Sequence, residues 1–267
     1  MQTAKVTILG CGGSGGIPLI GPNWGRCNPD NPRNRRRRVS VLLEHPAAKI
    51  LFDTSPDLRM QMLDADCSSI DAVLYTHDHA DHTQGIDDVR FLKARSGGTI
   101  DAYGSAETFA TLMQRFTYIF AQSTKGSGHL YKPFLTPHQI DIPSQFEVRG
   151  LPVAAFQQDH GFGSVTTGYR VGNMGYSTDA VDLPEEAFDL LQGLDLWIVD
   201  CLRFEPHGTH AHFDKALSWI ERIKPKHAVL THLNHMMDYD EVAQRCPPGV
   251  EPAYDGLTIE IPAVNPA

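Results

Sequence analysis

The chain has 267 residues and a formal net charge of −9, so it can bury a core but lacks the basic excess of a general nucleic-acid-binding surface. Its hydrophobic fraction of 41% is typical of a soluble globular protein, and no apolar run reaches the ~18 residues of a membrane span. Five scattered cysteines and an N-terminus without a signal-peptide pattern indicate reduced thiols and a cytoplasmic protein. We expect a single domain over residues 1–267, which could assemble as a homodimer.

The first predicted strand, Lys5–Gly10, leads into a turn of small residues, Cys11–Gly16. No Lys-Ser/Thr pair or helical pattern follows, so we interpret this segment as a tight turn under the functional site. Direct contact with an anion is the alternative.

Five arginines lie in Pro32–Arg38, directly before an apparent strand at Val39–Glu44. Alternate side chains of a strand face opposite sides of a sheet, so one or two arginines of the Arg35–Arg38 run could reach toward a phosphate. Structural ion pairing or solvation is the alternative.

The third predicted strand starts at Lys49 and ends at Asp53. Ser55 and Pro56 are typical of a helix cap and first turn after it. Asp53 could accept the N–H of a metal-ligating histidine and fix its tautomer, or it could simply cap the turn.

Four metal-capable side chains follow the next apolar run, Asp71–Tyr75. Imidazole and carboxylate groups suit borderline divalent cations such as zinc, manganese, iron or nickel. One ion cannot use four groups on so short a tether, whereas two adjacent ions can. The four residues are His77, His79, Asp81 and His82.

After this loop the sequence predicts a short helix at Gly85–Lys93, a strand at Ile100–Tyr103, and a helix capped by Ser105. Residues 123–143 have the composition of a surface insertion, in which His129 and His138 stand isolated.

Later strands repeatedly end in histidine or aspartate. The three residues are His160, Asp179 and His232. Ligands collect at strand carboxyl ends because the sheet fixes the backbone while the loops can vary. Alternating strand blocks and helices, including a predicted helix at Phe213–Ile223, indicate a layered α/β fold.

The pattern His-x-His-x-Asp-His at residues 77–82, followed by a His, an Asp and a His at later strand ends, resembles the metallo-β-lactamase superfamily. The resemblance implies a four-layer αβ/βα sandwich. It also implies that His77, His79 and His160 hold one metal, that Asp81, His82 and His232 hold a second, and that Asp179 bridges the two.

The opening Gly10-Cys-Gly-Gly, the segment Asp53–Arg59 and Gly85-Ile-Asp-Asp resemble the phosphodiesterase branch of this superfamily. That branch contains tRNA 3′-processing endonucleases and, as the nearer match, phosphoribosyl 1,2-cyclic phosphate phosphodiesterases. The latter carry an extra cysteine-rich zinc site. Here Pro22, Trp24 and His235-Met236 occupy the matching places, and Cys27 alone cannot rebuild the site, so we predict no structural zinc.

Two divalent cations, zinc or manganese, at about 3.5 Å separation would bridge a water and leave it as hydroxide near neutral pH. Asp81 could help to orient this nucleophile. The resemblance places a general-acid histidine in Glu205–His210, with His207 preferred and His210 in reserve. Histidine suits this role because its pKa lies near neutrality. The alternative is that these histidines only approach the next helix.

We therefore expect a binuclear metal-dependent phosphodiesterase that hydrolyses a small, cyclic sugar- or nucleotide-phosphate diester. One alternative is a tRNA 3′-processing endonuclease-like activity, against which the acidic net charge argues. The other is a non-catalytic protein that binds metal or a metabolite.

Overall fold

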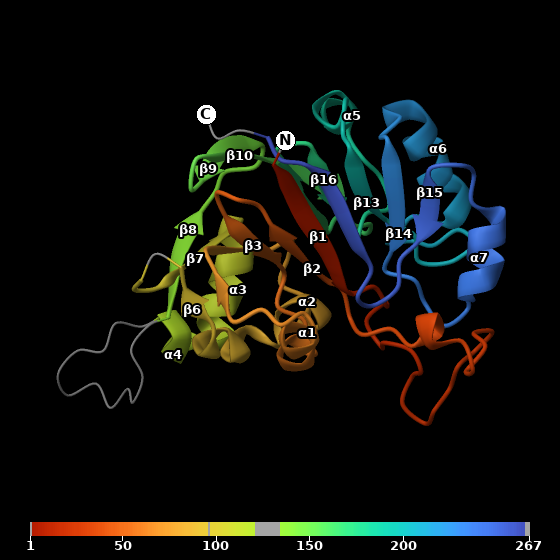
Figure 1. The fold of residues 1–267 in the computed structure, drawn as a ribbon, viewed down its shortest axis with the longest axis horizontal. Coiled ribbons are helices and arrows are strands. Elements are labelled where there is room, and N and C mark those ends of the chain that lie inside the picture. The colour runs from red at the N-terminus through yellow and green to blue at the C-terminus, as the bar shows by residue number, and fades with distance from the viewer. Residues whose placement is uncertain (1, 96, 121–133, 265–267) are drawn as a thin grey trace.

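The computed structural model describes residues 2–95, 97–120 and 134–264, and two seven-stranded sheets form its centre (Figure 1). The first sheet has the order β16 (Thr258–Pro262), β1 (Thr3–Gly10), β2 (Ser40–Glu44), β3 (Lys49–Phe52), β5 (Ala72–Leu74), β7 (Ile100–Gly104) and β8 (Leu135–Gln139). The second has the order β15 (Val250–Pro252), β14 (His227–Thr231), β13 (Leu196–Asp200), β12 (Met174–Ser177), β11 (Val165–Val171), β10 (Leu151–Asp159) and β9 (Ser144–Val148). Short strands β4 (Ser69–Ile70) and β6 (Lys93–Ala94) pair with each other.

Helices cover the outer face of each sheet, as Figure 1 shows. On the first sheet these are α1 (Leu58–Asp64), α2 (Ala80–Thr83), α3 (Ala106–Arg115) and α4 (Thr117–Phe120). On the second they are α5 (Glu185–Leu190), α6 (Phe213–Ile223) and α7 (Tyr239–Arg245). Two 3₁₀ helices, η1 (Pro32–Asn34) and η2 (Ile86–Phe91), lie in connections. The predicted four-layer αβ/βα sandwich is confirmed.

Three apolar clusters correspond to the three interfaces between these layers. Phe52 of the first sheet packs edge-on against Tyr176 of the second, with ring centroids 5.1 Å apart. Within β13, Ile198 belongs to this central cluster, whereas Trp197 belongs to the cluster under α6. Both faces of β13 are therefore buried, which explains its continuous apolar sequence.

Three of the strand-ending aspartates and histidines have a left-handed backbone. Asp53 follows β3 with φ 58°, Asp179 follows β12 with φ 54°, and His232 follows β14 with φ 59°. Non-glycine residues rarely adopt this conformation, and it is concentrated at functional sites. The chain turns sharply at each of these points, so the side chains stay at the strand ends instead of continuing along the sheets.

Several predicted local features differ from the structure. Helix α1 begins at Leu58 rather than at Ser55, whose hydroxyl instead donates to Gln61 Oε1 at 2.8 Å. Residues 86–91 form a 3₁₀ helix. The end of the expected surface insertion is β8, which pairs with β7. The rest of that insertion, with His129, lies largely outside the described residues.

Among the described residues, none of the helices combines the length and the apolar character that crossing a membrane requires.

Candidate metal centre

The first sheet supplies the ligands that are close together in sequence. His77 and His79 follow β5, and the short helix α2 begins directly after His79 and carries Asp81 and His82. The rings of His77 and His82 have centroids 4.2 Å apart, and those of His77 and His79 are 4.4 Å apart. The helical turn therefore brings the four groups of this loop to one place.

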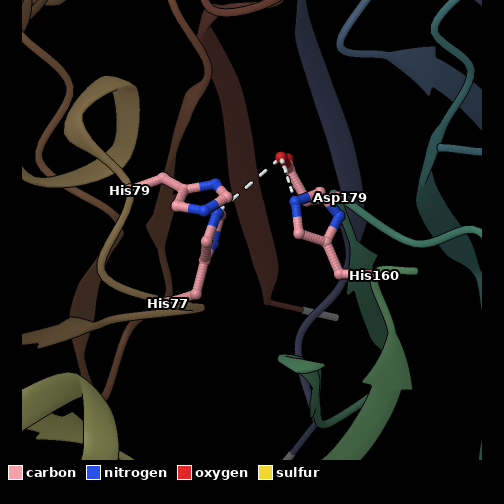
Figure 2. A group of neighbouring side chains, drawn as sticks. All are labelled: His77, His79, His160 and Asp179. Carbon is pink, nitrogen blue, oxygen red and sulfur yellow. Dashed lines mark ion pairs between the residues drawn. The ribbon is translucent and has the colours of Figure 1, made fainter. Parts of the chain in front are cut away.

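The second sheet supplies ligands from across the molecule. His160 follows β10, Asp179 follows β12 and His232 follows β14, all at the sheet end that faces the His77–His82 loop. Figure 2 shows His77 and His79 approaching from one side and His160 and Asp179 from the other, with their polar atoms directed toward one another. The structure thus brings together all seven residues that the sequence nominates as metal ligands. Two candidate groups are His77, His79, His160 and Asp179, and Asp81, His82 and His232. A third consists of Asp179, His232 and one further residue, His210.

Asp179 divides its two oxygens between these groups. Its Oδ2 lies 3.8 Å from His77 Nε2 and 3.9 Å from His160 Nε2. Its Oδ1 lies 3.2 Å from His82 Nε2 and 3.5 Å from His232 Nε2. Burial alone would raise the pKa of Asp179, but His232 and His82 hold it well below its usual range. The carboxylate is therefore charged and placed between two sets of imidazoles.

The residues of this cage fit divalent cations. Among the described residues, the buried Nε2 atoms of His77, His82 and His232 have no hydrogen-bond partner. Burial, together with neighbouring His82, lowers the pKa of His77 well below its usual value, so this ring is neutral and offers a lone pair. Buried polar atoms without partners are costly, and a cation at the centre of the cage would satisfy them.

Asp53 organises the first-sheet side of the cage from behind. Its Oδ2 lies 2.8 Å from His82 Nδ1, and it also accepts a hydrogen bond from the Thr76 hydroxyl at 2.9 Å. The Thr76 hydroxyl is in turn 3.0 Å from His77 Nδ1. With Nδ1 bound to an acceptor, each ring turns its Nε2 into the cage. Of the two sequence interpretations of Asp53, this geometry favours support of a ligand over capping of a turn.

Asp200, at the end of β13, is the equivalent residue on the second sheet. Its Oδ2 lies 3.0 Å from His210 Nδ1 and accepts the backbone N–H of Ala180 at 3.0 Å. Its Oδ1 is 3.9 Å from His232 Nδ1. The sequence alone predicts no role for Asp200. The available signal was an aspartate that ends a buried apolar strand, as at Asp53.

His210 and His207 have different surroundings. His210 is buried, its Nε2 lies 3.9 Å from Asp179 Oδ2, and its ring stacks on His232 with centroids 4.6 Å apart. Burial alone would lower the pKa of His210, but Asp200 raises it to about 9. His207 is one ring further out, 5.4 Å from His210, with a pKa lowered by burial and by His210. The reserve candidate, His210, is thus the one that borders the cage.

The glycine-rich turn after β1 contacts the second-sheet side of the cage. A Cβ added to Gly13 would lie 3.6 Å from His232 Cε1, and the Gly13 N–H donates to the Leu233 carbonyl at 3.2 Å. This position agrees with a tight turn beside the metal site.

The arginine run serves structural contacts. Arg37 pairs with Asp64 at 2.6 Å and Arg38 with Asp57 at 2.8 Å, while Arg35 lies over the Trp24 ring. Arg36 is 2% exposed and donates to the Met237 carbonyl at 2.7 Å. Of the two interpretations, the structure favours ion pairing and packing over phosphate contact.

The loop between β1 and β2 is held to the segment after His232 by side chains. The Asp238 carboxylate accepts the Asn28 N–H at 2.9 Å and the Asn34 amide at 2.7 Å. Cys27 contributes a buried thiol whose pKa is raised by desolvation. Pro22 and Trp24 cannot ligate zinc, so these residues do not fit the structural zinc site of the resembling phosphodiesterases.

The chain belongs to the β-lactamase superfamily, because residues 48–233 match the family model described as "Beta-lactamase superfamily domain". With the His/Asp cage, this membership defines a metal-dependent hydrolase.

Comparisons with individual proteins show more specific similarities. It is 33% identical to a crystal structure described as a new diphosphatase from the PhnP family, with a TM-score of 0.87 and coverage of 97% of this chain and 98% of the other. It shares the fold of human tRNase Z, short form, at 18% identity, a TM-score of 0.68 and coverage of 97% and 99%. It is also 32% identical to an octanoyltransferase of Porphyromonas gingivalis over 95% of this chain. The chain spans about half of that relative's length, 51%.

Proposed function

We propose that the protein is a binuclear metal-dependent phosphodiesterase that acts on a small phosphate diester. The observation that carries this proposal is the position of Asp179, whose two oxygens face imidazoles from both sheets. A carboxylate shared in this way suits two adjacent cations. The similarity to a PhnP-family diphosphatase at 33% identity supports phosphate ester chemistry.

The residues named above would hold two zinc or manganese ions. His77, His79 and His160 would hold one, and Asp81, His82 and His232 the other, with Asp179 between them. When bound, such ions polarise a phosphoryl group and activate water near neutral pH.

His210 would supply the proton to the leaving alcohol. Its Nδ1 is held by Asp200 at 3.0 Å, so Nε2 is directed to the edge of the cage at which a leaving oxygen would depart. Asp200 would fix the tautomer and orientation of the ring during this transfer. We assign this role to His210 rather than to His207, because His210 borders Asp179 and His207 is one ring removed.

A phosphodiester assay tests the proposal. Protein loaded with manganese or zinc should hydrolyse bis(p-nitrophenyl) phosphate, and Asp179→Asn should abolish this activity. If the wild type binds metal but hydrolyses the diester no faster than Asp179→Asn does, the result would instead support a non-catalytic metal-binding protein. Cleavage of a precursor tRNA in preference to small diesters would support the tRNA 3′-processing alternative.

The description of the PhnP-family structure as a diphosphatase favours a second candidate substrate class, the diphosphate diester. The same cage could serve it, because both reactions transfer a phosphoryl group to water. Parallel assays with ADP-ribose and a 2′,3′-cyclic nucleotide, each followed by release of phosphate monoester, would distinguish the two linkages.

A further inference from the structure

The loop that follows His160 presents an aromatic side chain to solvent. Residues 160–164 connect β10 to β11, and Phe162 within them is 93% exposed. The His160 N–H donates to the Ser164 carbonyl, and the Ser164 N–H donates to the Gly161 carbonyl, each at 2.9 Å. These two bonds close the loop on itself, so its backbone holds Phe162 in a defined position.

The backbone of this loop is unusual for a bulky residue. Gly161, Phe162 and Gly163 have consecutive positive φ values of 79°, 53° and 81°. Glycine adopts such angles freely, but phenylalanine adopts them at a cost in free energy. A residue that is 93% exposed recovers little of that cost through burial in this chain. A strained and exposed aromatic residue therefore indicates that Phe162 serves a function other than packing in the core.

The ring lies beside the loop that carries His210. A Cβ added to Gly161 would be 2.0 Å from the Gly208 carbonyl oxygen, so the two loops are in direct contact. A Cβ added to Gly208 would be 3.0 Å from Phe162 Cζ, so one edge of the ring rests on that glycine. His160 adds a hydrogen bond between the same two loops, because its Nδ1 donates to the Thr209 carbonyl at 2.8 Å. Phe162 thus stands at the rim of the metal centre, on the His160 and His210 side.

We propose that Phe162 is a specificity-determining residue that stacks on a planar aromatic base in the substrate. This inference rests on the proposed phosphodiesterase function and narrows it to nucleotides or other phosphate esters with such a base. Two residues of chain span at most ~7 Å, so the Cα of Phe162 lies within a nucleoside's reach of the Cα of His160. A phosphate in the cage could then place its base over the exposed face of Phe162.

Equilibrium binding separates this role from catalysis. AMP and ribose 5-phosphate carry the same phosphate and sugar and differ in the base. Isothermal titration calorimetry on the metal-loaded protein should show AMP binding about 5- to 150-fold more tightly than ribose 5-phosphate, the range expected for one base stacked on an aromatic side chain.

Phe162→Asn should reduce this ratio to near one and leave ribose 5-phosphate affinity unchanged. Asparagine tolerates the left-handed backbone, so the loop should keep its shape and the melting temperature should not fall. Phe162→Trp, which keeps an aromatic ring at this position, should retain the preference for AMP. Val165→Ala, which trims an exposed side chain of the same hairpin, should leave the ratio as in the wild type.

Equal affinity of the wild type for the two ligands, or an unchanged ratio in Phe162→Asn, would overturn the inference while leaving the phosphodiesterase proposal intact. A parallel loss of affinity for both ligands in Phe162→Asn would also overturn it, because it would show that the residue only holds the loop. If neither ligand bound the metal-loaded wild type, the phosphate site itself would be refuted.

Discussion

Asp53 and Asp200 are buried carboxylates that stand behind the metal cage and hold histidines in it. Each lies within 3.0 Å of a histidine Nδ1, on opposite sheets. Supporting groups of this kind set the tautomer and the direction of metal-ligating rings. The cage therefore depends on residues that never touch the metal.

Asp53→Asn should weaken metal affinity by about 10- to 100-fold, because its NH2 group would face either the Thr76 N–H or the donors of the Thr76 hydroxyl and His82, where Asp53 has an accepting oxygen. Titration of the apoprotein with zinc in competition with a chelator would measure the change. Asp71→Asn is the matched control: Asp71 is also buried, but it accepts from Lys49 N–H and Arg95 at the other end of β5. Equal losses of affinity in the two variants would contradict the role of Asp53.

His210→Gln should lower kcat by about 10²- to 10⁴-fold for diesters with an alkyl leaving group. The loss should be much smaller for p-nitrophenyl esters, since p-nitrophenolate leaves without a proton. His207→Gln should affect both substrates little. Equal losses on both substrates in His210→Gln, with metal content reduced, would show that His210 is a metal ligand rather than a proton donor.

At the scale of elements, helix α7 anchors the loop between β1 and β2. The Asp238 carboxylate caps α7 by accepting the N–H groups of Asp240 and Glu241, and it also binds Asn28 and Asn34. Because α7 follows His232 closely, this anchor joins the loop to a strand end of the metal centre.

Asp238→Ala should lower the free energy of unfolding by about 2 kcal/mol, through loss of the helix cap and of the loop contacts. Burial alone would raise the pKa of Asp238, but the Asn28 N–H and the Asn34 amide lower it overall. A lowered pKa stabilises the fold above the ordinary carboxyl pKa, and this contribution is lost as the pH falls.

The difference between wild type and Asp238→Ala in urea unfolding should therefore be full at pH 7 and shrink below about pH 4. Asp240→Ala, in the same helix, removes an exposed contact with Asn31 and one first-turn charge, and should change stability by less than about 1 kcal/mol. A pH-independent difference would contradict the contribution of the Asp238 charge.

At the scale of the whole molecule, the cage joins the two sheets. The His77–His82 loop extends from the first sheet, and His160, Asp179 and His232 extend from the second. Metal ions held between them would bind only the folded arrangement, so their binding free energy adds to stability.

Removal of metal should therefore lower the melting temperature. At a hundredfold excess over Kd, one ion contributes about 2.7 kcal/mol. For a chain of this size this corresponds to roughly 5–10 °C. Calorimetry before and after dialysis against EDTA would measure the shift, and Asp179→Asn should show a much smaller one. An EDTA shift as large in Asp179→Asn as in the wild type would indicate that the stabilising metal lies elsewhere.

The sequence by itself determined the features that depend on neighbouring residues. The His77–His82 loop is recognisable because its four groups are tied together within six positions, and β13 and α6 follow from apolar patterns that are local to each element. The strand-end positions of His160, Asp179 and His232 were also predictable, because each lies at the end of a segment with strand-like composition.

Only the tertiary structure decided which of these side chains meet. Asp200 lies between Ala180 and His232 because β13 lies between β12 and β14, and His210 rather than His207 borders Asp179 because of how its loop packs. The arginines are engaged by Asp57, Asp64 and Met237, residues that lie well away from the arginines along the chain. Each of these outcomes depends on contacts between distant segments, and a pattern of adjacent residues does not encode which distant segment will become the neighbour.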